Sequence, residues 1–145
     1  MIADGTGPVS RLVVGFDASP PAARAARLAI DLGRGGRAQV WLVYAHRPDP
    51  RLAEPRTEEE VRSPAVATER AMELLVREGR SRGVEVLPVL RDGDPATVVL
   101  AVSREVGAGM IMVGTRGLGA AARVLLGAVS SRIVSASTVP VTVVP

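Results

Sequence analysis

Five short apolar runs separated by helical segments constrain the fold of this 145-residue chain more than any other feature. Most of the runs are continuously apolar instead of alternating, which is typical of central strands that are buried on both faces. We predict strands at 11–16, 39–45, 84–90 and 110–113, and a last strand from Val139 to Val144. A strand–helix unit that occurs four times before a final strand predicts an open, mostly parallel α/β sheet with right-handed crossovers.

Helix signals lie between the runs. Ser19, Ser63 and Asp94 each precede a proline, and such side chains accept a bond from a free first-turn N–H while proline suits the first helical position. We predict helices from Pro20 to the glycines at 33–36, over 65–82, over 96–106 and from near Gly127. The expected sheet-facing residues are Ala22, Ala25, Ala26, Ala29 and Leu32, then Ala67, Ala71, Leu74 and Leu75, and then Val129, Ile133 and Val134.

The sequence also indicates which strands lie at the sheet edges, where a long loop occurs, and how many domains the chain forms. Pro88 and Pro140 cannot donate to a ladder, so their strands are expected at sheet edges or end there. The segment 46–62 is rich in proline, arginine and glutamate and is expected to be a mobile surface loop. We find no internal repeat, and we expect a single domain over 1–145 with helices on both faces of the sheet.

Missing residue types exclude much enzyme chemistry. The chain has no cysteine and no lysine, so thiol chemistry, a Walker-type phosphate lysine, a Schiff base and a lysine general base are excluded. The single histidine, His46, excludes a multi-histidine metal site. The start of the chain lacks a signal-peptide pattern and no apolar run is long enough to span a bilayer, so we expect a cytoplasmic protein with no membrane partner.

Charge is distributed unevenly. The net charge is only +3, but no acidic side chain follows Glu105, while Arg116, Arg123 and Arg132 do. This segment is either a solvated basic face or a local positive field for an anion. Aromatic residues make up 2% of the chain, so stacking platforms for nucleic acid are poorly supported and no nucleic-acid partner is expected.

Three segments are expected at one edge of the sheet, where open parallel sheets bind ligands outside the carboxyl ends of their strands. They are 15–19 after the first strand, 44–46 after the second, and 114–117 after the fourth.

The third of these segments opens a glycine-rich stretch. Gly114 and Gly117 let backbone N–H groups approach an anion, and Gly127 precedes a helix whose first N–H groups attract phosphate. Thr115, Ser130 and Ser131 add hydroxyls, and Arg116 could clamp phosphate oxygens. By itself, however, the stretch fits a turn followed by a flexible loop at least as well as it fits a phosphate site.

The spacing Gly114-x-x-Gly117, nine residues, then Gly127 resembles the G-2x-G-9x-G-[S/T] signature of the universal stress protein family. "LVVGFDASPPAARAARLAI", "GDPATVVLAVSREVGAGMIMVGTRGLG" and "LLGAVSSRIVSASTVPVTVVP" are similar to that family's first strand and helix and to its segment from the third helix to the end. The resemblance implies a Rossmann-like, adenine nucleotide alpha hydrolase-like five-stranded sheet of order 3-2-1-4-5 and usually a homodimer. It also implies two subclasses, one that binds ATP and one that does not.

The resemblance implies roles for individual residues. Asp17 matches the acidic position near the phosphates and the metal (Mg²⁺ or Mn²⁺) of the ATP-binding members, although it could equally be a turn residue at a helix start. Gly15 and Phe16 match backbone positions near the nucleotide, and Phe16 could also be ordinary core. Ala45 matches the position whose backbone holds adenine. The glycine signature covers Val113, Gly114, Thr115, Arg116, Gly117, Gly127, Ala128, Val129 and Ser130.

Three positions depart from the family pattern. Ala128 replaces the final Ser or Thr of the signature, which removes one hydroxyl worth about 1 kcal/mol and is expected to weaken ATP binding without abolishing it, with Ser130 in part compensating. Gly109 replaces an acidic residue that is common before the fourth strand, and we expect this change to affect only the local turn structure. Tyr44 stands where histidine is frequent, and His46 is expected to be a strand-end residue and no catalyst.

The implied function is a regulatory or signalling dimer that binds ATP together with a divalent metal and hydrolyses it slowly at most, because no general base or lysine is evident at the phosphates. The alternative is a stress-protein dimer of the non-ATP subclass, favoured by Ala128 and Ala45. In both cases we expect a two-fold dimer through the exposed apolar strand from Val139 to Val144.

Overall fold

The computed structural model describes residues 10–36, 38–46, 64–115 and 126–145. Strands and helices alternate along the chain as predicted. Their bounds are β1 Arg11–Gly15, α1 Pro20–Gly33, β2 Gln39–His46, α2 Pro64–Ser81, β3 Glu85–Asp92, α3 Pro95–Val106, β4 Met110–Gly114, α4 Ala128–Ala136 and β5 Val141–Val144. In the described part of the chain, no helix is long and apolar enough to cross a membrane.

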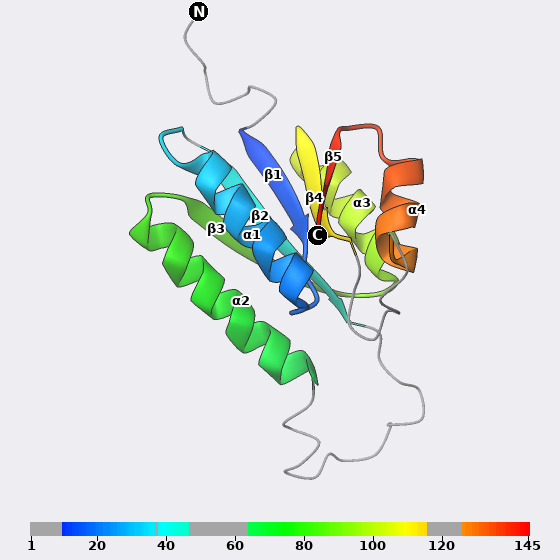
Figure 1. The fold of residues 1–145 in the computed structure, drawn as a ribbon, viewed down its shortest axis with the longest axis horizontal. Coiled ribbons are helices and arrows are strands. Elements are labelled where there is room, and N and C mark those ends of the chain that lie inside the picture. Colours follow the sequence, from blue (N-terminus) through cyan, green and yellow to red (C-terminus); the bar gives the residue numbers. More distant parts are fainter. Residues whose placement is uncertain (1–9, 37, 47–63, 116–125) are drawn as a thin grey trace, which may run out of the picture.

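The five strands form one parallel sheet in the order β3-β2-β1-β4-β5, which confirms the fold implied by the sequence (Figure 1). Helices α1 and α2 lie on one face, and α3 and α4 cover the other. The two prolines lie at the edges, as expected: Pro88 is in edge strand β3, and Pro140 directly precedes edge strand β5.

Alternate residues of the central strands supply the two cores. Leu12 and Val14 of β1 pack beneath α1, while Val13 between them packs beneath α3, and all three are completely buried. Because burying one such side chain stabilises the fold by about 1.5–3 kcal/mol, this doubly buried strand anchors the sheet. Packing on both faces therefore fixes the position of the carboxyl end of β1.

The predicted helix starts are confirmed where the structure describes them. Ser19 accepts a hydrogen bond from the Ala22 N–H at 3.3 Å, and Asp94 accepts one from the Thr97 N–H at 3.0 Å. Ser63 lies outside the described residues.

The predicted helix faces are confirmed in part, because Ala22, Ala25, Ala26 and Ala29 of α1, Leu75 of α2 and Ile133 of α4 are buried as expected, and the other positions differ. In α1, Leu32 is exposed and Ile30 is buried in its place. In α2, Ala67 and Leu74 are exposed and Ala71 is half-buried, whereas Thr68, Met72, Leu75 and Gly79 are buried. In α4, Val129 and Val134 are exposed, whereas Ser130 and Ile133 face the interior. Each helix carries small or apolar residues on more than one side, so the apolar pattern alone did not determine the full set of residues that meet the sheet.

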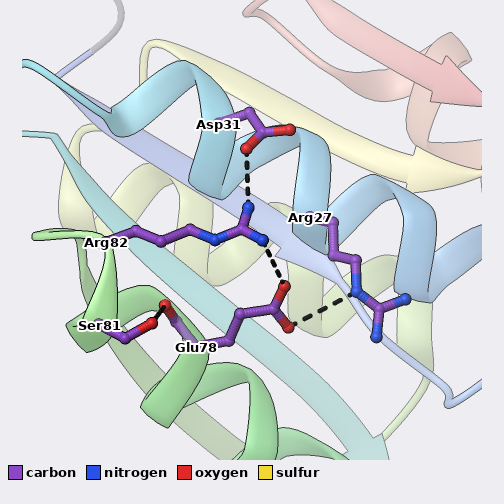
Figure 2. A network of polar contacts seen from close by, with 5 residues as sticks. All are labelled: Arg27, Asp31, Glu78, Ser81 and Arg82. Atoms are coloured by element: carbon purple, nitrogen blue, oxygen red, sulfur yellow. Dashed lines mark hydrogen bonds and ion pairs between the residues drawn. The ribbon is translucent and has the colours of Figure 1, made fainter.

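Charged side chains connect the two helices on the α1–α2 face (Figure 2). Arg82, directly after α2, bonds Asp31 of α1 at 2.9 Å and Glu78 of α2 at 3.2 Å. Glu78 also pairs with Arg27 of α1 at 3.5 Å. The flank of α2 that faces α1 thus has its charges paired within the chain.

Candidate functional site at the carboxyl edge of the sheet

The turn after β1 is joined directly to β2. The Phe16 N–H donates to the Val43 carbonyl at 2.8 Å, which continues the β1–β2 ladder past the end of β1. Phe16 itself is buried in the core under α1, so its side chain has the ordinary core role that the sequence left open. Only its backbone remains for a ligand.

Asp17 builds the next turn. Its Oδ1 accepts the Ser19 N–H at 2.9 Å, and Ala18 between them has a φ of +64°, a left-handed conformation that side-chain-bearing residues seldom adopt. Such strain is often held at functional sites. Asp17 therefore has the turn role that the sequence allowed, and it follows directly on the carboxyl end of β1.

Two glycines at this edge lie where a Cβ would come close to a neighbouring segment. A Cβ on Gly114 would lie 2.7 Å from Pro21 Cβ and 2.8 Å from the Ala22 nitrogen, in the first turn of α1. A Cβ on Gly15 would lie 3.1 Å from Cγ1 of Val113. Gly114 is thus required for the end of β4 to pack against the start of α1, independently of any ligand.

The end of β4 is fixed to its neighbours through Thr115. The Thr115 N–H donates to the Val144 carbonyl at 2.8 Å. Its carbonyl accepts the Gly127 N–H at 2.6 Å and the Ser130 hydroxyl at 2.9 Å. Consequently the start of α4 stands beside the end of β4, although residues 116–126 separate them along the chain.

The start of α4 differs from the starts of α1 and α3. Its cap residue, Gly127, has no side chain with which to bond the first-turn N–H groups of Ala128, Val129 and Ser130. The Ser130 hydroxyl does not cap them, because it donates to the Thr115 carbonyl and lies 3.2 Å from the Gly127 carbonyl. The first turn therefore offers backbone donors and a positive dipole end to an anion.

The Ser130 hydroxyl thus holds α4 against β4. Its compensation for the hydroxyl missing at Ala128 would have to come through its backbone N–H, because its side-chain proton is already donated. Ala128 and Val129 are exposed, so their N–H groups lie at the surface of the helix start.

Tyr44 brings β2 to the same edge. Burial raises the pKa of its phenol, a hydrogen bond from Thr68 opposes that rise, and the negative charges of Glu69 and Asp17 add to it. The phenol therefore stays protonated at neutral pH. The pairing of Gly15 with Val43 and the Phe16–Val43 hydrogen bond place the turn after β1 beside the last part of β2, as the sequence predicted.

Asp94 and Arg132 connect the starts of α3 and α4. Arg132 Nη1 bonds Asp94 Oδ2 at 2.6 Å, and its Nη2 lies 3.4 Å from the Thr97 hydroxyl. Hydrogen bonds from the backbone and the hydroxyl of Thr97, then the charge of Arg132, hold the pKa of Asp94 well below its ordinary value of 3.8. In the sequence Arg132 is recognisable only as part of a basic segment, because no local spacing relates it to Asp94.

The other predicted site residues stand as follows. Ala45 is half-buried near the end of β2, on the α3 face. His46 ends β2, with its Nδ1 3.6 Å from a carboxylate oxygen of Asp92. Arg116, Gly117 and the loop after His46 lie outside the described residues.

Among the described residues, no three or more histidine, aspartate or glutamate side chains gather where they could hold a metal. Asp17 is a single carboxylate. One carboxylate suits a Mg²⁺ ion that completes its coordination with phosphate oxygens and water, and it does not suit a metal cage made by the protein alone.

The open parallel sheet of order 3-2-1-4-5, with its glycine-lined carboxyl edge, defines a doubly wound, Rossmann-like α/β protein. Within this class the chain belongs to the universal stress protein family, whose model matches residues 8–145. It is 32% identical over 135 residues to a universal stress protein of Thermus aquaticus, a match that covers 92% of this chain and 96% of the relative.

Solved structures support the same fold. The hypothetical protein MJ0577 superposes with a TM-score of 0.83 at 20% identity, over 95% of this chain and 96% of its own. Two neighbours with a TM-score of 0.68 were solved with adenine nucleotides. One is a universal stress protein in complex with cAMP (22% identity, 93% and 95% coverage). The other is the Archaeoglobus fulgidus protein in complex with dAMP (19% identity, 93% and 96% coverage).

Proposed function

We propose that this protein binds ATP at the carboxyl edge of its sheet and acts as a regulatory or signalling dimer in a stress response. The observation that carries the proposal is the start of α4. There, three backbone N–H groups without a side-chain cap stand next to the glycine end of β4. The complexes of two structural neighbours with cAMP and dAMP favour an adenine nucleotide as the ligand.

In this proposal each segment of the edge has a distinct role. The first turn of α4 holds the phosphates beside Gly114 at the end of β4. The backbone of Ala45 and the turn at Gly15 and Phe16 hold the nucleoside. Asp17 binds a Mg²⁺ or Mn²⁺ ion that the phosphates share.

ATP hydrolysis is slow or absent in this proposal, because the chain has no lysine, and the carboxylate of Asp17 already accepts the Ser19 N–H. Phosphoryl transfer needs a group that orients the attacking water. The ligand therefore acts through occupancy, and a cytoplasmic location is part of the same proposal.

The dimer of the proposal forms through β5. This strand is a sheet edge whose four residues are all half-buried. Arg24 of α1 bonds the Pro145 carbonyl at 2.6 Å and so holds the end of β5 against the body of the protein. An ordered apolar edge of this kind is suited to pair with a second copy.

A non-ATP subclass function is the second candidate, and Ala128 favours it because this position lacks the hydroxyl of the family signature. Mass spectrometry of the ligand released from natively isolated protein separates the two candidates. Release of ATP or another adenine nucleotide supports the first. Protein that carries no nucleotide and shows no thermal shift at millimolar ATP supports the second.

A further inference from the structure

A groove lies on the opposite side of the molecule from β5, between α2 and edge strand β3. It encloses about 340 Å³. The apolar residues that line it are Met72, Val76, Pro88 and Leu90, and the charged residues are Glu69, Glu73, Arg77 and Arg80. Leu90 is 49% exposed, so an apolar side chain of β3 stands open to solvent there.

The charges along the groove are arranged in two halves. Glu69 and Glu73 occupy its start along α2, while Arg77 and Arg80 occupy its end. All four side chains are exposed, and none of them forms an ion pair with another described residue. The opposite flank of the same helix differs, because Glu78 and Arg82 there are paired with α1 (Figure 2).

This pattern is complementary to itself under a two-fold rotation. The midpoint between positions 69 and 80 is 74.5, and the midpoint between 73 and 77 is 75, so the two charge pairs share a centre within about 1 Å along the helix. Two antiparallel α2 helices would place Glu69 opposite Arg80 and Glu73 opposite Arg77 of the second copy. Two parallel α2 helices would instead place glutamates opposite glutamates and arginines opposite arginines.

We infer that this groove is a second interface between copies of this chain, made by antiparallel packing of α2 and β3 around a two-fold axis. The apolar residues of the two grooves meet at its centre, and the four carboxylate–arginine pairs surround them. The contact is made by side chains, because Pro88 removes a backbone donor from the middle of β3 and disfavours continuation of the sheet across this edge.

The interface is independent of the nucleotide and of β5. Since β3 and β5 are opposite edges of the sheet, a copy paired at both would connect further copies into larger assemblies. The groove thus adds an assembly surface to the proposed β5 dimer.

Charge reversal tests the inference. The variants Glu69→Arg/Glu73→Arg and Arg77→Glu/Arg80→Glu each place like charges across the two-fold axis, so each alone should associate at least about tenfold more weakly than the wild type. Mixed in equal amounts, they oppose opposite charges at every position and should form a mixed complex. Sedimentation velocity at low salt measures both effects, and high salt should weaken the mixed complex.

The control is Arg34→Glu/Arg104→Glu, which reverses two exposed arginines away from the groove and should leave association unchanged. Circular dichroism establishes that each variant is folded. The inference is overturned if the two reversed variants, each folded, sediment as the wild type does, or if their mixture sediments as the sum of its parts.

Discussion

Ser130 joins α4 to β4 through the Thr115 carbonyl, to which its hydroxyl donates at 2.9 Å. Ser130 is only 3% exposed, so this bond forms in the interior at the place where the proposed phosphate site begins. The same carbonyl accepts the Gly127 N–H at 2.6 Å. The first turn of α4 is therefore positioned by the end of β4, whether or not a ligand is bound.

Removal of this hydroxyl should loosen the helix start. We expect Ser130→Ala to lower the free energy of unfolding by about 0.5–1.5 kcal/mol, as the loss of one hydrogen bond does, and to weaken ATP binding. Urea denaturation and calorimetry measure the two effects. Ser131→Ala, at the half-buried neighbouring position, is the control and should change both quantities less. Equal effects of the two substitutions would contradict the role given to Ser130.

Gly114 should not tolerate a side chain. Because an added Cβ would lie under 3 Å from backbone atoms of Pro21 and Ala22, we expect Gly114→Ala to destabilise the fold by about 1–3 kcal/mol. Gly36→Ala is the matched control: a Cβ there meets nothing within 4 Å, and its effect should be neutral or slightly stabilising. Thermal unfolding compares the two, and a Gly114 variant as stable as the control would refute the close approach.

The depressed pKa of Asp94 makes a pH-dependent contribution to stability. Folded Asp94 binds its proton less readily than unfolded Asp94, so its ionised form stabilises the fold above the ordinary pKa of 3.8. That contribution is lost as the pH falls below this value toward the folded pKa. We expect Asp94→Asn, which keeps a capping side chain, to be less stable than the wild type at pH 7 and to approach it below about pH 3. Denaturation at several pH values checks this, and a constant difference would contradict it.

The proposed β5 dimer should be sensitive to charge at the edge strand. Val141 and Val143 are half-buried on β5 and pair only with β4 within the sheet. We expect Val141→Glu/Val143→Glu to give monomers in dilute solution, because two carboxylates per copy would add like charges to the strand that forms the contact. Light scattering measures the mass. A dimer that persists in the folded variant would show that β5 is not the contact.

Local signals in the sequence predicted the sheet and its order of elements well. Continuous apolar runs gave the positions of the strands, and Ser19 and Asp94 were recognised as caps because side-chain capping depends only on neighbouring residues. The strand order 3-2-1-4-5 came from the family resemblance and is confirmed.

What depends on tertiary packing was not predictable. Leu32, Leu74 and Val134 were placed toward the sheet but are exposed, because helices with apolar residues on two flanks can be rotated without changing their pattern. The contact of Arg132 with Asp94 joins residues 38 positions apart, and no local spacing marks it. The hydrogen bond from the buried Ser130 hydroxyl to the Thr115 carbonyl could not be predicted either, because it depends on where the end of β4 lies relative to α4.

The most direct test of the proposed nucleotide site is calorimetric titration of ATP with Mg²⁺ into the wild type, Ala128→Ser and Ala128→Asp. The serine restores the hydroxyl of the family signature and should tighten binding by up to about 1 kcal/mol, roughly fivefold. The aspartate places a negative charge at the start of α4, which favours the helix but repels phosphate, so it should abolish binding without lowering thermal stability. The proposal predicts measurable binding to the wild type and this order among the variants. No heat with the wild type and with Ala128→Ser, or equal affinity of all three proteins, would contradict it.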